Sequence, residues 1–437
     1  MKLYNYNNLT QQEIKELCSR KVEDDDLVFS SVKNIISAVK NEGDSALLSY
    51  AEKFDSVKLS SLFIAKEELA ELASQIPISV KNAIDIAYQN IYKFHEAQLK
   101  EEAKVETMPG VNCWREARAI EKVGLYIPGG TAVLPSTFLM LGIPAKIAGC
   151  KEIVVCSPPQ NDGKINCYIA YVSTLLGIEK VYLVGGAQAV GAMAFGTQTI
   201  PKVDKIFGPG NRYVTEAKKM IQNAVAIDMP AGPSEVLVIA DDTANPTFVA
   251  ADLLAQAEHG SDSQAILVST SKRIIEEVTL AIENQINELP RKDIAAKAIE
   301  NSYIVFAETL TEAMDFSNAY APEHLILACE NFEPLVPLII NAGSVFLGNL
   351  TPESAGDYAS GTNHTLPTSG FAKAYSGVSV DTFLKKITFQ HLSALGLANI
   401  GNTVEILAEA EGLQAHKNAI TIRLKKNAIT IRLKKKD

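Results

Sequence analysis

The stretch that decides the fold is VGLYIPGG, residues 123–130. Residues 123–127 form a short, continuously apolar run, which predicts a buried strand, and the glycines after it predict a tight turn. An apolar helix is expected next, from about Ser136 to Ala148. Apolar strands that alternate with single helices are typical of a parallel sheet covered by helices on both faces.

The same alternation continues along most of the chain. Further strands are predicted at 153–156, 181–184 and 203–207, with helices over 167–176, over 187–194 and from Asn211. A second series of strands is predicted at 235–240, 265–268, 303–306, 325–327 and 344–347. The sequence therefore predicts an α/β fold with two similar doubly wound lobes. The segment before Glu121 has the spacing of amphipathic helices, as in residues 80–99, and we expect it to pack mainly against the second lobe.

Three glycine turns follow strands of the first lobe and precede its helices, at residues 128–130, 185–186 and 208–210. Open α/β sheets bind ligands at this edge, where helix N-termini offer free N–H groups to phosphate. None of the turns is a GxGxxG motif, and glycine at a strand end can also be only a requirement of the turn. Three such turns on one edge favour a cofactor site.

Composition limits the class of partner. The chain has 437 residues, enough for two or three domains, with 47% hydrophobic and 21% charged residues. Its net charge of −10 argues against nucleic acid, which is bound by clustered lysine and arginine. Its N-terminus has no apolar signal-like core, and no apolar run approaches the roughly 20 residues of a membrane-spanning helix. We therefore expect a cytoplasmic protein that acts on a small molecule.

The six cysteines include no CxxC pair, which argues against a thiolate zinc site or a redox motif. Buried, reduced thiols are the simpler interpretation. Cys113 and Cys150 stay open as nucleophile candidates, although neither has an adjacent base.

Histidines are few and lie beside carboxylates. Of the six histidines, His324 and His364 lie in the segment 321–366, which also holds Glu323, Glu353 and Asp357. Imidazole titrates near neutral pH and binds metals, so this grouping indicates acid/base chemistry and a metal. The protein is therefore interpreted as an enzyme.

Gln256 and His259 are three residues apart at a predicted helix C-terminus, so they share a face. With Asp357 and one more nitrogen ligand, they would complete a plausible zinc site. A histidine that bonds to the last helix carbonyls would have the same pattern, and the pair alone does not separate the two interpretations.

Glu323 and His324 stand at the start of the predicted strand 325–327, where side chains can reach a cleft. Histidine suits deprotonation of an alcohol, and glutamate suits activation of water. The alternative is a surface glutamate beside a packed histidine. We interpret His95 and His391 as structural.

The C-terminus contains an exact tandem repeat, because NAITIRLKK at 418–426 recurs at 427–435. One copy alternates apolar and polar residues, which predicts a β-strand. The second copy is interpreted as an appended, frayed end.

Eight ordered motifs resemble those of histidinol dehydrogenases, over the chain from its N-terminal helix to about Leu424. The motifs are YIPGG (126–130), GGAQ (185–188), FGPGN (207–211), DMPAGPSE (228–235), QAEHG (256–260), APEHL (321–325), GDYASGTNH (356–364) and EGLQAH (411–416). The resemblance implies a homodimeric enzyme with one zinc ion per subunit. Such an enzyme oxidises L-histidinol to L-histidine through L-histidinal with two NAD⁺, the last steps of histidine biosynthesis.

The resemblance also implies residue roles. Glu323 and His324 would transfer protons, and the zinc ligands would be Gln256, His259, Asp357 and His416. Besides the ligands and His324, the substrate would be held by Ser234, His364 and Glu411. The NAD contacts would be Tyr126, Gln188 and Asn211. The C-terminal segment would cross to the partner subunit, so Glu411 and His416 would complete the partner's site.

The expected domains combine this resemblance with the strand pattern. They are an N-terminal helical segment at 1–21, an incomplete Rossmann-like NAD lobe at 121–235, a zinc and catalytic lobe at 22–120 and 236–378, and a dimerisation segment at 379–437.

Two rival functions are a zinc hydrolase, in which Glu323 activates metal-bound water, and a two-lobe binding protein with a structural metal.

Overall fold

The computed structural model describes residues 1–20, 26–129, 133–229 and 232–434. By its internal contacts the chain divides into two compact units. The larger unit comprises Met1–Gln98 and Ile120–Phe383, and the smaller unit comprises Leu99–Ala119 and Leu384–Asp437. The larger unit contains two six-stranded sheets, and the smaller unit contains a three-stranded sheet.

The first sheet of the larger unit has the strand order β2-β7-β6-β5-β8-β9. Its strands are β2 (Phe63–Ala65), β5 (Lys122–Tyr126), β6 (Glu152–Ser157), β7 (Lys180–Leu183), β8 (Lys205–Phe207) and β9 (Ala226–Ile227). All pairs are parallel except that of β2 with β7. The connecting helices are α6 (Pro135–Ala148), α7 (Cys167–Leu175), α8 (Gly186–Phe195) and α9 (Arg212–Met220).

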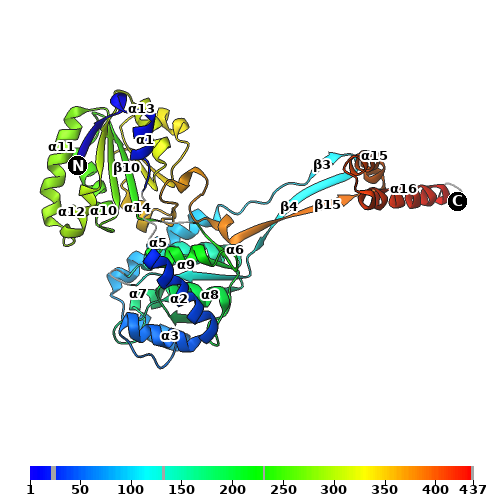
Figure 1. The fold of residues 1–437 in the computed structure, drawn as a ribbon, viewed down its shortest axis with the longest axis horizontal. Coiled ribbons are helices and arrows are strands. Elements are labelled where there is room, and N and C mark those ends of the chain that lie inside the picture. Colours follow the sequence, from blue (N-terminus) through cyan, green and yellow to red (C-terminus); the bar gives the residue numbers. More distant parts are fainter. Residues whose placement is uncertain (21–25, 130–132, 230–231, 435–437) are drawn as a thin grey trace. The chain divides into compact units, whose positions relative to one another are not determined.

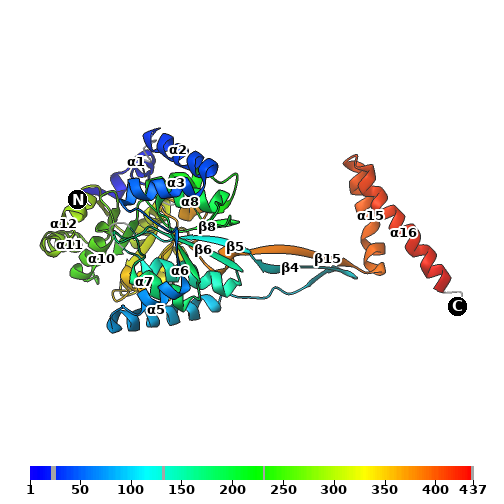
Figure 2. The same ribbon diagram turned by 90° about the horizontal axis from the view of Figure 1, so that it is seen from below.

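Successive side chains of these strands point to opposite faces, which explains the covering on both sides. On β6, Val155 packs in the core formed with α6 and α7, and its neighbours Val154 and Cys156 pack in the core formed with α8 and α9. Figure 2 shows α6 and α7 on one side of β5 and β6, and α8 on the other. The inner strands β5, β6, β7 and β8 are thus largely buried, as their continuous apolar runs predict, whereas the edge strand β9 has no buried residue.

The second sheet has the order β1-β12-β11-β10-β13-β14 and is parallel throughout. Its strands are β1 (Lys2–Asn5), β10 (Glu235–Ala240), β11 (Gln264–Ser269), β12 (Tyr303–Phe306), β13 (His324–Ala328) and β14 (Ser344–Leu347). One face is covered by α10 (Pro246–Ala257), α11 (Lys272–Gln285) and α12 (Lys292–Glu300), and the other by α1 (Gln11–Leu17) and α13 (Leu310–Tyr320) (Figure 1).

Both sheets have the same strand order, although the added N-terminal strand is antiparallel in the first and parallel in the second. When the five strands of each series are counted from its first, they lie in the order 3-2-1-4-5, and a strand from the N-terminal region joins beside the third. This is the order of a dinucleotide-binding sheet without its sixth strand. The expected α/β class with parallel sheets and N-terminal helices is confirmed.

The expected partner is confirmed for α1 but wrong for the helices that follow it before residue 121. The helices α2 (Asp26–Glu42), α3 (Asp44–Tyr50), α4 (Lys66–Ala73) and α5 (Ile78–Glu96) belong to the first sheet's layers, because α2 packs on α8 and α9, α4 on α7, and α5 on α6. Helical periodicity shows that a helix has an apolar face but not which surface covers that face. Residues 1–21 also differ from expectation, since β1 precedes the helix α1.

The smaller unit joins β3 (Val105–Met108), β4 (Val111–Ala119) and β15 (Leu384–Leu392) in an antiparallel sheet, followed by α15 (Ala394–Ala410) and α16 (Gln414–Lys434). The boundaries therefore differ from the expected segment 379–437, because residues 99–119 belong to this unit as well. Figure 1 labels β4 beside β15, in agreement with their pairing.

The predicted β-strand in the repeated tail is wrong, because α16 is a helix that includes the first copy and most of the second. Ile420 and Leu424, one turn apart, pack on α15 at Gly401, while Ile422 between them is 65% exposed. A nine-residue alternation also contains an i, i+4 apolar pair, and alanine, leucine, arginine and lysine all favour helix. Packing on α15 selects the helix.

Within the described part of the chain, no helix combines the length and the apolar character needed to cross a lipid bilayer.

Candidate active site

The titratable residues of the candidate site gather where strands of the second sheet begin. His324 is the first residue of β13, Glu323 precedes it, and Glu235 is the first residue of the neighbouring strand β10. Val236 lies opposite His324 in the register of these strands, so the two strand starts are side by side. The site therefore forms at the amino ends of parallel strands.

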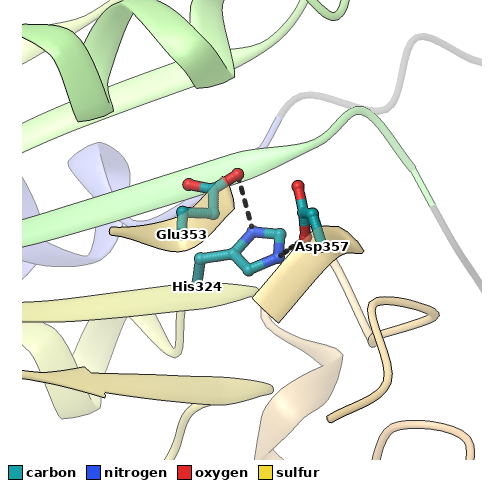
Figure 3. A group of neighbouring side chains, drawn as sticks. All are labelled: His324, Glu353 and Asp357. Carbon is teal, nitrogen blue, oxygen red and sulfur yellow. Dashed lines mark ion pairs between the residues drawn. The ribbon is translucent and has the colours of Figure 1, made fainter. Parts of the chain in front are cut away.

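A short helix, α14 (Glu353–Tyr358), adds two carboxylates to the same place. Figure 3 shows the imidazole of His324 between the carboxylates of Glu353 and Asp357. Its Nδ1 lies 3.6 Å from Glu353 Oε1 and 3.8 Å from Glu323 Oε2, and its Nε2 lies 3.6 Å from Asp357 Oδ1. All four residues are buried. One imidazole is thus surrounded by three carboxylates in a space with little water.

This arrangement shifts the pKa values strongly. Burial opposes the charge on His324, but Glu353, Glu323 and Asp357 outweigh burial and raise its pKa to about 10. Burial raises the pKa of Glu323 to about 8, against the effect of His324, and burial also raises the pKa of Glu353. Burial favours a raised pKa for Asp357 too, but the nearby His324 outweighs burial and lowers it. So many buried carboxylates indicate a site for positive charge.

The hydrogen bonds of His324 select its tautomer. Nδ1 lies 3.2 Å from the carbonyl oxygen of Glu235, and because a carbonyl only accepts, Nδ1 carries the hydrogen in the neutral imidazole. Nε2 has no hydrogen-bond partner among the described residues. In the neutral ring, Nε2 is therefore the nitrogen that accepts a proton, and the surrounding carboxylates favour the ring that has gained it.

The side chains around this cluster fit a divalent cation. Gln256, in the last turn of α10, is fully buried, and neither its amide oxygen nor its nitrogen has a hydrogen-bond partner among the described residues. Leaving such a group unpaired costs about 1–3 kcal/mol. One oxygen each of Glu353 and Asp357 and one nitrogen of His324 lie within 4.8 Å of one another. Carboxylate, amide oxygen and imidazole donors together suit zinc.

His259 and His364 extend the cluster. His259 is exposed, yet the protein packed around it disfavours the charged imidazole and lowers its pKa. The nearby Asp357 carboxylate acts in the opposite direction. The Nδ1 of His364 lies 2.8 Å from the carbonyl oxygen of Asp357, and its Nε2 lies 3.1 Å from the hydroxyl of Thr137 on α6. Both expected histidines thus lie beside Asp357.

The remaining expected residues of this site divide between the two units. Ser234 directly precedes β10, and its carbonyl accepts the N–H of Gln264 at 3.1 Å. Glu411 follows α15 and His416 lies in the first turn of α16, so both belong to the smaller unit, where both are exposed.

The expected NAD contacts lie at the carboxyl ends of the first sheet. Tyr126 ends β5, and its hydroxyl accepts the N–H of Gly186 at 3.2 Å. Gln188 is buried in the first turn of α8, and Asn211 caps α9 by accepting the N–H groups of Tyr213 and Val214. All three stand where strands β5, β7 and β8 lead into helices.

The glycine turns at this edge have structural reasons as well. At Gly208, φ is +129°, and a Cβ would lie 2.2 Å from the carbonyl oxygen of Tyr126. Only glycine fits there. Gly130, in the turn 128–130, lies outside the described residues.

The sequence places Glu353 in the carboxylate-rich segment 321–366 but assigns it no role, although it lies against His324. Its spacing of four residues from Asp357 places both on one face of a helix. That spacing is the signal that could have identified it. The helix is only six residues long, and neither its N-cap nor its apolar pattern marks it clearly.

Comparisons with known proteins agree with the motifs. The family model for histidinol dehydrogenase matches residues 18–424. The histidinol dehydrogenase of Bacteroides fragilis is 54% identical over 426 residues, which cover 97% of this chain and 99% of that protein. The chloroplastic histidinol dehydrogenase of Arabidopsis thaliana is 52% identical over 430 residues, with 97% and 92% covered.

A solved structure extends the agreement to the fold. The crystal structure of histidinol dehydrogenase from Elizabethkingia anophelis matches with a TM-score of 0.94 at 53% identity, and the match covers 98% of each chain. The family resemblance of the motifs is thereby confirmed. The chain belongs to the histidinol dehydrogenase family, a family of NAD-dependent oxidoreductases.

Proposed function

We propose that this protein oxidises L-histidinol to L-histidine through L-histidinal, with two NAD⁺ and one zinc ion per subunit, as the last two steps of histidine biosynthesis. The observation that supports the proposal is the buried group of Glu323, His324, Glu353 and Asp357, in which three carboxylates surround one imidazole. The family membership supplies the substrate.

The ligands of the zinc would be Gln256, His259, Asp357 and, from the partner subunit, the residue equivalent to His416. When bound, zinc would supply a positive charge that holds the imidazole and amine of the substrate and offsets the surrounding carboxylates. The unpartnered amide of Gln256 and the position of Asp357 support this set. Ser234, His364 and Glu411 would hold the rest of the substrate.

His324 would act as the base in both oxidations. Its free Nε2 takes the hydroxyl proton of histidinol as hydride passes to NAD⁺, which leaves the aldehyde and NADH. After that proton is released, the same nitrogen takes a hydroxyl proton from the hydrated aldehyde as the second hydride leaves. The Nδ1–H contact with the Glu235 carbonyl supports this role because it keeps Nε2 unprotonated in the neutral ring.

Glu323 would act only in the second oxidation, because only the aldehyde must gain water before it can lose hydride. A carboxylate removes a proton from that water as its oxygen bonds to the aldehyde carbon. Burial raises the pKa of Glu323 to about 8, near the range in which a carboxylate can both accept and return a proton. Tyr126, Gln188 and Asn211 would contact the NAD.

The enzyme would act as a homodimer in which Glu411 and His416 serve the partner's site. Exposed apolar side chains on α15, on α16 and in the turn between them support a second copy as their cover. They are Leu395, Ile406, Leu407, Leu413 and Ile422. A metal site with three expected ligands in the larger unit and the fourth in the smaller unit is consistent with sharing between subunits.

The direct test is the growth of NADH absorbance when the zinc-loaded protein receives histidinol and NAD⁺. Two NADH per histidinol, with histidine as the product, are expected. A zinc hydrolase or a binding protein would produce no NADH, and one NADH per histidinol would limit the enzyme to the first oxidation.

A further inference from the structure

Arg20 makes a bidentate ion pair with Glu235, the first residue of β10. Its Nε donates to Glu235 Oε1 at 2.8 Å, and its Nη2 donates to Oε2 at 2.6 Å. The side chains are 12% and 2% exposed. A planar guanidinium that binds both oxygens of a carboxylate fixes the orientation of that carboxylate, which a lysine cannot do.

The remaining guanidinium nitrogen of Arg20, Nη1, binds a different segment of the chain. Its Nη1 donates to the carbonyl oxygen of Tyr320 at 2.6 Å, and the guanidinium lies 3.5 Å from the centre of the Tyr320 ring. Tyr320 ends α13, three residues before Glu323. Arg20 therefore joins the start of β10 to the segment that leads into β13.

The backbone of Glu235 contacts both proton-transfer residues. Its N–H donates to Glu323 Oε2 at 2.9 Å, and its carbonyl oxygen lies 3.2 Å from His324 Nδ1. Glu235 thus orients the carboxylate of one residue and selects the tautomer of the other. Any shift of this backbone would move both groups.

Backbone strain marks the same place. Three non-glycine residues of the described chain have positive φ, and two of them flank this network: Ala321 (φ 55°), directly after Tyr320, and Ser369 (φ 55°), whose N–H donates to Glu235 Oε1 at 2.8 Å. Such conformations cost on the order of 1–3 kcal/mol and persist only where surrounding contacts hold them. The Arg20–Glu235 pair supplies contacts at both.

We propose that Arg20 is a positioning residue for Glu323 and His324, which acts through Glu235 and the carbonyl of Tyr320. The inference rests on the proposed function, because it assigns the two positioned groups to proton transfer. Arg20 touches neither of them. Without it, zinc and substrate should still bind, but the base and the water activator should lose their alignment.

The first test compares Arg20→Lys, Arg20→Ala and the double variant Arg20→Met/Glu235→Gln with the wild type. The double variant guards against misfolding, because it leaves no buried carboxylate without a partner. A misalignment of about 1 Å costs about 10²-fold in rate. We therefore expect kcat to fall by about that factor in the double variant, with unchanged KM for histidinol and unchanged zinc content. The matched control is Arg273→Met, since Arg273 makes an exposed pair with Glu277 on α11.

Two further readouts separate positioning from simple loss of structure. Added guanidinium ions should restore part of the kcat of Arg20→Ala but leave Arg20→Lys and the wild type unchanged. Hydrogen exchange of the amides in residues 319–326 and 367–370 should be faster in the variants than in Arg273→Met.

The proposal is overturned if the double variant keeps kcat within about twofold of the wild type, or if its kcat and zinc content fall in equal proportion. A wild type that reduces no NAD⁺ with histidinol would refute the proposed function instead. The exchange measurement would still decide whether Arg20 orders the segments around Glu323 and His324.

Discussion

The two sheets of the larger unit have the same strand order, yet their candidate functional residues lie at opposite ends of the strands. In the first sheet, the candidate residues Tyr126, Gln188 and Asn211 lie where strands end. In the second sheet, Glu235 and His324 begin their strands. A shared strand order therefore does not decide which ends of the strands form a site. The side chains and loops at those ends decide it.

The two sites also differ in how their buried charged side chains are paired. Near the first sheet's glycine turns, the buried Lys218 is paired with Asp228 and also donates to the carbonyl of Gly208 at 3.0 Å, so its charge is satisfied within the chain. In the second sheet, three carboxylates surround His324, and Gln256 is left unpaired. The charge of Lys218 is thus balanced within the chain, whereas the carboxylates around His324 favour a cation. The experiments below test this contrast.

The largest effect is expected from His324→Asn, which tests the base proposed at the second sheet. Asparagine removes the base but can still donate to the Glu235 carbonyl, so the fold and zinc should be retained while turnover falls by about 10²–10⁴-fold. Steady-state rates and zinc analysis measure both effects. The control is His391→Asn, because His391 is exposed on β15. A loss below about tenfold would mean that another group is the base.

Metal dependence tests the charge requirement of the second sheet. Chelation should abolish activity and added zinc should restore it. His259→Asn and Asp357→Asn should each bind zinc at least about 10–100-fold more weakly, because that is the usual cost of losing a group that only supports a ligand. Zinc content after dialysis measures this, with Glu276→Gln on the exposed face of α11 as the control. If both site variants keep full zinc, neither residue is a ligand.

Glu323→Gln separates the two oxidations. Turnover of supplied histidinal should fall by about 10²-fold or more, since glutamine cannot accept the proton of water, whereas oxidation of histidinol to the aldehyde should suffer much less. Single-turnover measurements with each substrate give the two rates. An equal loss in both would contradict the assignment of Glu323 to water activation alone.

Subunit mixing tests whether the smaller unit completes the site of a partner. Inactive His416→Asn and His259→Asn subunits should recover up to about a quarter of wild-type activity, because random pairing gives about half heterodimers with one intact site in two. Activity is followed after joint refolding, with each variant refolded alone as the control. Heterodimers that form without recovering activity would exclude a shared site.

The smallest effect is expected from the tail. Truncation after Lys426 keeps Ile420 and Leu424, which pack on α15 at Gly401, so zinc content and turnover should stay near the wild-type values. Truncation before Asn418 removes those contacts and should lower both. If removal of 427–437 alone destroys activity, the second copy of the repeat has a structural role.

Local sequence was sufficient wherever the signal is itself local. The predicted strands 303–306 and 344–347 coincide with β12 and β14, because an apolar run that is too short for a helix and lies between turn residues favours a buried strand. Asn245 and Pro246 likewise start α10 as expected from capping chemistry. The motifs around Glu323, Asp357 and His259 predicted side chains that the structure brings near one another, and their roles stay a prediction.

Only the tertiary structure decided what those elements touch. The sequence shows that α5 has an apolar face and that residues 418–426 contain alternating apolar residues, but α6 and α15 determine how each is buried. The ion pair of Arg20 with Glu235 joins residues 215 positions apart, and no local pattern encodes it. Periodicity, caps and turns act over a few residues, whereas a pairing between distant side chains exists only after the whole chain has folded around it.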